Sequence, residues 1–221
     1  MHHTQTNLID IQNKIKEKIT NLSYNNYNPK IIAVSKTFSE KDILPLLNHG
    51  HGEFGENKVQ EALQKWGTLK ENYKNIKLHM VGKLQTNKVK HAVEIFDYIH
   101  SLDNLKLAKK LAKEIHEKNK KIKLFIQINL GDEKQKSGIE PSQLESFYQN
   151  CSALNLDIVG TMCIPPVDQD TKLYFKNLYQ LNQKFNFQEI SMGMTNDYLD
   201  AVEYKSTFLR VGTGIFGKRS N

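Results

Sequence analysis

Cysteine is scarce in this chain of 221 residues, which contains only Cys151 and Cys163. Two cysteines build neither a disulfide framework nor a cluster of metal ligands, and this usage fits a reducing compartment. No stretch approaches the roughly 20 consecutive apolar residues that a membrane-spanning helix needs. Residues 1–10 also lack the basic flank and the apolar run of a secretory signal peptide. We therefore expect a cytoplasmic protein with no membrane partner.

Arginine is almost absent, because Arg210 and Arg219 are the only arginines among 31 basic residues. The formal net charge is +7, which raises the question of a nucleic-acid partner. The lysines are interleaved with Asp and Glu and do not alternate with aromatic residues, which favours a solvated surface. We therefore expect no specific nucleic-acid partner. Arg219, near the end of the chain, is interpreted as a solvated residue, whereas Arg210 requires a specific role.

Apolar runs of strand length alternate with segments of helical period along almost the whole chain. An amphipathic first helix is marked by Leu8, Ile11, Ile15 and Ile19. The expected strands are residues 31–35, 52–54, 78–81, 98–100, 123–130, 156–162, 189–192 and 207–211. The expected helices are 39–48 with Ser39 as N-cap and Asp42 three residues later, 56–66, one through Val89, Val93 and Phe96, 104–119, one opened by Pro141, 170–185 and one from about 196.

Eight strand–helix units with short connections predict an α/β fold of one domain over residues 1–221. The pattern matches a single (β/α)8 TIM barrel with an extra N-terminal helix. An open flavodoxin-like sheet is the alternative, since such sheets also alternate strands and helices. The strand count depends most on the weak segments 52–54 and 98–100.

Active sites of such barrels lie at the carboxyl ends of the strands, so the residues just past each strand are the candidates. This set contains one lysine, one arginine and several small hydrogen-bonding groups. Its members are Lys36, Asn57, Gly82, Ser101, Asn129, Met162, Ser191, Gly193, Arg210, Gly212 and Thr213.

Lys36 directly follows the apolar run 31–35, so its stem is expected to rise inside the mouth of the barrel. A lysine in that place must be paired or lose its charge. A neutral amine facing a cavity is the nucleophile of Schiff-base chemistry. The alternative is a surface lysine that extends its ammonium group into water.

Two glycine-containing segments, 191–195 (SMGMT) and 210–217 (RVGTGIFG), follow the last two expected strands. Barrels often hold phosphate at this place, where N–H groups at the start of a short helix favour an anion. The alternative is a pair of tight structural turns. Arg210 supplies a rigid and permanently protonated donor beside them, or else an ion pair at the rim.

The same residues carry a resemblance that spans nearly the whole chain. The motifs AVSKT, HGEFGENKVQE, LHMVGKLQTNK, GTMCIPP, SMGMTND and LRVGTGIFG occur in that order. Together they resemble the pyridoxal phosphate homeostasis protein family. One departure concerns residues 203–205, where Glu203, Tyr204 and Lys205 replace a small, glycine-containing stretch of the family; this bears on the local backbone and on the charge of the rim.

The resemblance implies a barrel like the N-terminal domain of alanine racemase, with pyridoxal phosphate as the cofactor. It implies a Schiff base on Lys36 and an Arg210 that faces the pyridine nitrogen. It further implies phosphate contacts from Ser191, Gly193, Gly212 and Thr213, and a cofactor lining that includes Asn57 and Met162.

The function implied by the resemblance is storage, buffering or delivery of the cofactor to pyridoxal phosphate-dependent apo-enzymes by a monomer. An arginine facing the ring nitrogen disfavours its protonation and so makes the ring a poorer electron sink. A racemase also needs a second base, for which Cys163, His79 and Tyr198 are the candidates; we expect Cys163 and His79 to be packed residues. No robust catalysis is therefore expected, and a weak single-domain amino acid racemase is the alternative.

Overall fold

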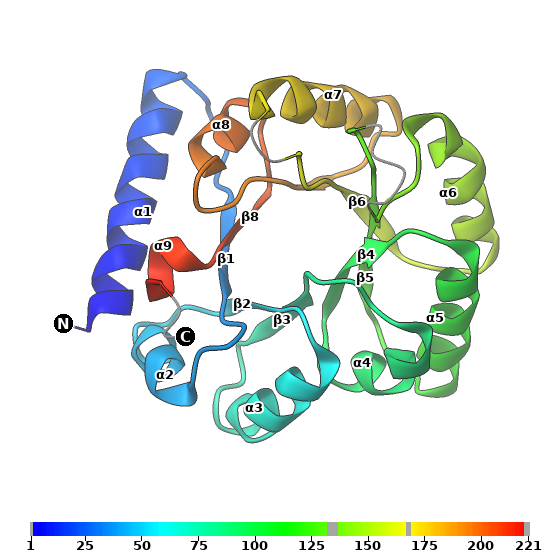
Figure 1. Cartoon of the computed structure of the whole chain (residues 1–221), viewed down its shortest axis with the longest axis horizontal. Helices are drawn as coiled ribbons and strands as arrows, with labels where there is room; N and C mark the ends of the chain where they lie inside the picture. Colours follow the sequence, from blue (N-terminus) through cyan, green and yellow to red (C-terminus); the bar gives the residue numbers. More distant parts are fainter. Residues whose placement is uncertain (1, 132–136, 167–168, 219–221) are drawn as a thin grey trace.

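The computed structural model describes residues 2–131, 137–166 and 169–218, and Arg219 lies outside these residues. Eight parallel strands form a closed barrel in the order β1 to β8, and helices surround it (Figure 1). The ring closes where β8 pairs with β1, with Ile32 opposite Arg210. The predicted (β/α)8 barrel is therefore confirmed, and the open-sheet alternative is wrong.

All of the expected strands are present, including the two weak ones. The strands are β1 Lys30–Val34, β2 Glu53–Glu56, β3 Lys77–Met80, β4 Tyr98–Leu102, β5 Lys123–Gln127, β6 Ile158–Met162, β7 Glu189–Ser191 and β8 Phe208–Val211. The helices are α1 His3–Asn21, α2 Glu40–Asn48, α3 Val59–Asn72, η1 Thr86–Lys88, α4 Val89–Ile95, α5 Leu105–Glu117, η2 Pro141–Gln143, α6 Leu144–Ala153, α7 Thr171–Lys184, α8 Tyr198–Glu203 and α9 Thr213–Phe216.

Short polar side chains define where several helices begin. Ser39 and Asp42 form the expected capping box of α2, since the Ser39 N–H donates to Asp42 Oδ2 over 3.1 Å. Asn104 accepts a 2.9 Å hydrogen bond from the Leu107 N–H at the start of α5, and Asp170 caps α7. Pro141 is the first residue of the short 3₁₀ helix η2, which continues into α6. These local signals fixed the expected boundaries to within a few residues.

The largest errors in the expected elements concern the second and fifth units. Residue Glu56 was expected to begin a helix, but it ends β2, because its side chain is fully buried and hydrogen-bonded inside the protein. The third helix then begins at Val59 and runs on to Asn72. The fifth strand was expected to reach residue 130, but β5 ends at Gln127, and Ile128 forms only an isolated bridge.

Alternation along the strands separates two cores. In β1, Ile31 and Ala33 face outward and join the large core between barrel and helices. Ile32 and Val34 face inward and join a second cluster inside the barrel, together with Tyr98, Phe125, Met162 and Phe208. Because successive side chains of a strand point to opposite faces, every second strand residue lies inside the ring.

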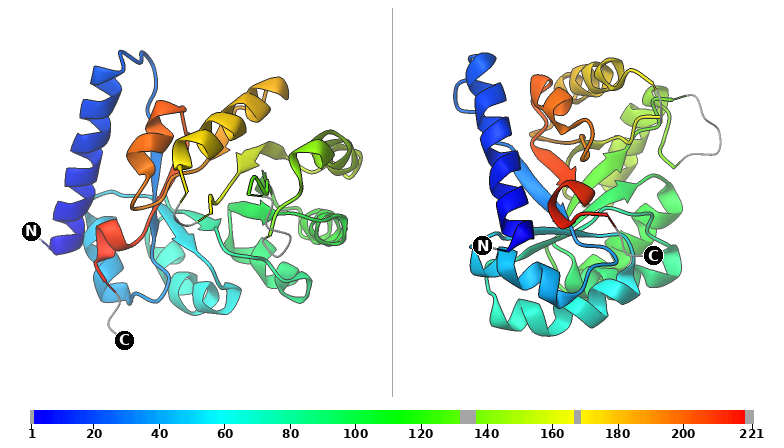
Figure 2. Two further views of the ribbon diagram at one scale, coloured as in Figure 1. Left: turned by 45° about the horizontal axis from the view of Figure 1, so that its top comes forward. Right: turned by 60° about the vertical axis from the view of Figure 1, so that its left-hand side comes forward.

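The first helix packs across the junction between the two ends of the chain. It contacts α2, α8 and α9, and it stands along the outside of the barrel in both further views (Figure 2). Its Leu8, Ile11 and Ile15 are buried, as expected from their spacing. No helix among the described residues is long and apolar enough to cross a bilayer.

The departure at residues 203–205 affects the backbone at one position. Lys205 has a φ of 55°, a left-handed conformation that glycine adopts more easily. Its ammonium group lies 4.9 Å from the centre of the Tyr24 ring, a cation–π contact that places the lysine charge beside an aromatic face. The turn after α8 thus keeps a left-handed residue without glycine.

Gly160 and Gly67 give opposite predictions for a change to alanine. A Cβ at Gly160 in β6 would overlap the carbonyl oxygen of Glu189, whereas a Cβ at Gly67 in α3 would meet nothing within 4 Å. We expect Gly160→Ala to destabilise the protein by at least ~1–3 kcal/mol, and Gly67→Ala to stabilise it by ~0.5–1 kcal/mol. Urea unfolding measures both. A Gly160→Ala variant as stable as the Gly67→Ala variant would contradict the close approach of β6 and β7.

Candidate functional site

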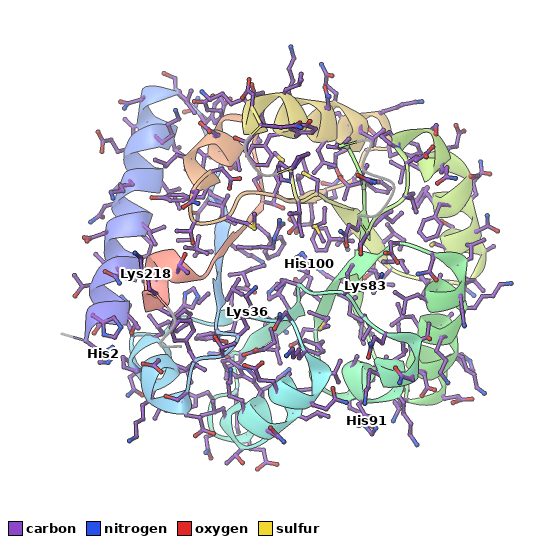
Figure 3. All side chains as sticks on the ribbon, viewed as in Figure 1. His2, Lys36, Lys83, His91, His100 and Lys218 are labelled. Carbon is purple, nitrogen blue, oxygen red and sulfur yellow. The ribbon has the colours of Figure 1, made fainter. Side chains whose placement is uncertain are left out.

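A cavity of about 540 Å³ lies at the carboxyl ends of the strands. This volume is within the 300–1,000 Å³ that is typical of small-molecule sites. The wall is formed by Val34, Lys36, Phe38, Val81, Ile164, Pro165, Pro166, Gln169, Thr171, Met194, Thr195, Asn196, Asp197, Asp200, Arg210, Gly212 and Thr213. In Figure 3 the labelled Lys36 and His100 lie toward the middle of the ring, whereas His2 and His91 lie at its periphery.

Lys36 is half-buried and lies two positions beyond the end of β1. The residue before it is held in place by Glu56 at the end of β2. Ser35 Oγ donates to Glu56 Oε1 over 2.7 Å, and Lys65 Nζ donates to the Ser35 carbonyl oxygen over 2.8 Å. The base of the Lys36 loop is therefore fixed from two sides, which limits where its amine can reach.

The Glu56 carboxylate is fully buried and is shared by several donors. Its Oε1 accepts hydrogen bonds from Ser35 Oγ, from Lys65 Nζ over 2.9 Å and from Trp66 Nε1 over 3.0 Å. Its Oε2 has no hydrogen-bond partner among the described residues. A buried carboxylate is stable only when paired and hydrogen-bonded, and Lys65, with a side chain only 9% exposed, supplies the opposite charge.

Arg210 projects from β8 into the barrel and reaches the cavity wall, although it is only 5% exposed. Its Nη1 donates to Ser191 Oγ over 2.7 Å, and its Nη2 donates to the Cys163 carbonyl oxygen over 2.8 Å. Its backbone N–H donates to the Gly193 carbonyl oxygen over 2.9 Å. Burial lowers the pKa of Arg210, and these bonds fix the orientation of the guanidinium group.

The two glycine-containing segments lie next to each other, as expected. Gly193 has a φ of 89°, and a Cβ there would lie 2.5 Å from the Ala201 Cβ, so this turn requires glycine. Thr195 Oγ1 accepts a 3.1 Å hydrogen bond from the Gly214 N–H and lies 3.2 Å from Thr213 Oγ1. Hydroxyl groups and backbone of both segments thus form one side of the cavity.

Two carboxylates, Asp197 and Asp200, also line the cavity. Burial raises the pKa of Asp197, and this effect is opposed by its hydrogen bond from the Met194 N–H and by the charge of Arg210. Among the described residues that line the cavity, the ionisable groups are therefore two basic ones, Lys36 and Arg210, and these two acids. The wall carries no large excess of either charge.

The structure brings four of the eight predicted site residues to the wall of this cavity. They are Lys36, Arg210, Gly212 and Thr213. The remaining four do not line it, and a cofactor-binding role stays a prediction for all eight. Ser191 and Gly193 hold Arg210 from beneath, and Met162 packs inside the barrel against the cluster that contains Val34.

Asn57 is the fourth predicted residue away from the wall, and it has a close neighbour in Gly82. A Cβ at Gly82 would lie 2.6 Å from the Asn57 Cβ, so the two loops after β2 and β3 pack backbone against side chain. The Asn57 Oδ1 is buried and has no hydrogen-bond partner among the described residues. A buried amide oxygen of this kind is an available acceptor for a ligand.

Several polar residues near the site were not predicted from the sequence. Asp197 of the wall lies beyond the predicted segment 191–195, which ends at Thr195. Glu53 and His100 lie within strands, at inward positions, and each is hydrogen-bonded to His79, which was expected to be a packed strand residue. In the sequence, such residues can be recognised as polar residues that occupy an inward position of a predicted strand.

Comparison with known proteins shows the family of the chain. The sequence profile of the family described as "Alanine racemase, N-terminal domain" matches residues 9–220. A relative from Aquifex aeolicus named "Pyridoxal phosphate homeostasis protein" is 35% identical over 200 residues, which cover 86% of this chain and 87% of the relative. The chain belongs to the pyridoxal phosphate homeostasis protein family.

Solved structures show the same relationship. PipY of Synechococcus elongatus, solved with PLP (pyridoxal phosphate) bound, is 33% identical and superposes with a TM-score of 0.81 over 92% of this chain and 100% of that chain. An alanine racemase of Clostridium difficile, 15% identical, shares only the fold, with a TM-score of 0.68 over 96% of this chain and 57% of its own length.

The three candidates for a second base are not among the described residues that line the cavity. Cys163 and His79 are buried in strand or strand-end packing, as expected. Burial raises the pKa of Cys163 to about 12. Burial lowers the pKa of His79, although the neighbouring Glu53 raises it in part. Burial also raises the pKa of Tyr198.

Both thiols are predicted to be inert in the folded protein. Burial raises the pKa of Cys151 to about 11 and that of Cys163 to about 12, so the reactive thiolate is rare at pH 8. We expect labelling by Ellman's reagent to be at least ~100-fold slower in the native protein than in denaturant, given a rise of two or more pKa units. Rapid native labelling of one thiol equivalent would contradict this burial.

Proposed function

We propose that this protein binds pyridoxal phosphate in the cavity and acts in its storage, buffering or delivery. The observation that carries this proposal is the convergence of Lys36, Arg210, Gly212 and Thr213 on one cavity of suitable size. The names of the curated relatives and the cofactor-bound PipY support it.

The residues present fit this cofactor. Lys36 supplies an amine on a loop whose base is fixed by Glu56. The hydroxyl groups of Thr195 and Thr213 and the backbone at Gly212 form the side of the cavity that suits a phosphate group.

Two further polar groups, Arg210 at the wall and Asn57 away from it, are proposed for the ring of the cofactor. Arg210 presents a guanidinium held on two sides, and the buried Asn57 Oδ1 has no partner among the described residues. Pyridoxal phosphate supplies an aldehyde and an electron-withdrawing ring. In this proposal the Lys36 amine holds the aldehyde carbon covalently, and Arg210 keeps a permanent positive charge beside the ring.

The cavity favours binding over turnover. Lys36 stands among the described wall residues with Arg210, Asp197 and Asp200, and the three candidates for a second base are elsewhere. An arginine beside the ring disfavours protonation of the ring, which weakens its capacity to stabilise a carbanion. The racemase alternative is favoured by one observation, the match to the family described by an alanine racemase domain.

The same proposal includes the setting of the protein. We propose a cytoplasmic monomer of one domain over residues 1–221, from which pyridoxal phosphate-dependent apo-enzymes receive their cofactor. Two free cysteines, both buried, support a reducing compartment.

Borohydride reduction tests the role of Lys36. After loading with pyridoxal phosphate and reduction, we expect peptide mapping to find the pyridoxyl group on Lys36. The Lys36→Ala variant should lose the adduct, because Lys36 is the one lysine among the described residues that line the cavity. Lys83→Ala is the matched control, since Lys83 lines a smaller cavity of about 200 Å³ beside the main one. An adduct on another lysine in the wild type would overturn this assignment.

Exchange of the α-proton separates a binding protein from a racemase. The loaded protein is incubated with L-amino acids in deuterated water, and deuterium at the α-carbon is followed by mass spectrometry. We expect exchange no faster than with Lys36→Ala plus free pyridoxal phosphate. Exchange at ~1 s⁻¹ or faster, lost in Lys36→Ala, would establish the racemase alternative.

A further inference from the structure

Five polar side chains form a continuous line of hydrogen bonds through the interior of the barrel. Glu53 Oε2, at the first residue of β2, lies 2.6 Å from His79 Nε2, and His79 Nδ1 lies 2.9 Å from His100 Nε2. His100 Nδ1 lies 2.8 Å from Ser191 Oγ, which accepts a hydrogen bond from Arg210 Nη1 over 2.7 Å. The line begins at the amino-terminal rim of the barrel and ends at the cavity wall.

The middle of this line is closed to water. The side chains of His79, His100 and Ser191 are fully buried. The His79 ring stacks on Tyr98 with centroids 4.4 Å apart, and the His100 ring stacks on Phe125 with centroids 4.3 Å apart. The stacking fixes both ring planes, so each buried nitrogen must find its partner within the line.

The chemistry of the two ends gives the line one direction. A carboxylate only accepts, so Glu53 receives the Nε2 proton of His79. A neutral His79 then accepts at Nδ1, which requires His100 to donate from Nε2. His100 accepts at Nδ1 from the Ser191 hydroxyl, and the Ser191 oxygen accepts from Arg210. All the donated protons point from Arg210 toward Glu53.

The charges around Glu53 keep this end ionised. Burial raises the pKa of Glu53, but the hydrogen bond from His79 and the charge of Lys30 lower it on balance. Lys30 of β1 places its ammonium nitrogen 3.7 Å from Glu53 Oε1. The Glu53 carboxylate, which is the acceptor end of the line, is therefore ionised at neutral pH.

Burial keeps the two histidines neutral. Burial lowers the pKa of His79, and the charge of Lys30 lowers it further. The Glu53 carboxylate beside the ring and Asp97 act in the opposite direction. Burial, His79 and the charge of Arg210 lower the pKa of His100 well below its ordinary value. Protonation of either ring would place a second cation in the line.

We propose that Glu53 is a positioning residue for Arg210, acting across the barrel through His79, His100 and Ser191. The inference rests on the proposed function in that Arg210 is taken to face the cofactor. With the acceptor at residue 53 in place, the Ser191 hydroxyl is committed to His100, and its oxygen lone pairs remain for Arg210. The opposite end of the barrel thus determines how the guanidinium presents itself to the cavity.

The histidine tautomers test the line without any cofactor. Protein with ¹⁵N-labelled histidine, free of pyridoxal phosphate, is studied at neutral pH by long-range ¹H–¹⁵N correlation spectra with assigned His79 and His100. We expect both rings to be neutral and protonated at Nε2. A main tautomer protonated at Nδ1, or a charged ring, would overturn the proposal whether or not the proposed function holds.

Three variants then test the effect on the cavity. Glu53→Ala removes the acceptor, Glu53→Gln retains an acceptor oxygen, and Glu189→Ala removes another acid at the first residue of a strand at the same rim. Each is loaded with pyridoxal phosphate. We expect Glu53→Ala to shift the visible absorbance of the bound cofactor and to release it at least ~5-fold faster, the loss of about one hydrogen bond. Glu53→Gln should restore most of both properties, and Glu189→Ala should match the wild type.

The outcomes separate this inference from the proposed function. The positioning role would be overturned if Glu53→Ala and Glu189→Ala gave the same absorbance and the same release rate. It would also be overturned if Glu53→Ala lowered the unfolding temperature and left the absorbance of the bound cofactor unchanged. A wild type that retains no pyridoxal phosphate would overturn the proposed function, and the tautomers would then decide the inference alone. The tautomers also decide it if Glu53→Ala does not fold.

Discussion

The pairing of β8 with β1 is the contact on which the candidate site depends. Lys36 follows the first strand and Arg210 belongs to the last, and 174 positions of sequence separate them. Only closure of the ring places both residues on one cavity wall. In an open sheet these two strands would lie at separate positions, and their two cations would not share a ligand.

Closure also creates an interior in which polar groups are costly unless they are satisfied. Arg210 meets this requirement through Ser191 and the Cys163 carbonyl oxygen, whereas Glu56, between the barrel and α3, is held at Oε1 by Ser35, Lys65 and Trp66. Removal of one partner from such a buried group leaves the other unpaired, which destabilises more than the bond itself stabilises. Two separate polar clusters thus hold the two cations of the cavity.

Much of the fold followed from the sequence, because apolar runs and helix caps act locally. Apolar runs such as those around Ile32 and Phe125, and a helix cap at Ser39, indicated the eight units. The site was predicted in part: the strand-end rule identified Lys36 and Arg210, but it passed over His100, which points inward within β4. A residue inside a strand acquires its partners from other strands, and single-sequence patterns carry no such pairing.

The position of α1 has a consequence for the order in which the molecule is completed during synthesis. Asn7 Nδ2 donates to the Ile215 carbonyl oxygen over 2.9 Å, and α1 packs on α8 and α9. Part of the apolar face of α1 therefore stays uncovered until α8 and α9, which follow much later in the sequence, have been made. Until β8 has emerged from the ribosome, β1 and β7 each present an unpaired edge, so a nascent chain lacks the pocket and exposes two sites for wrong strand pairing.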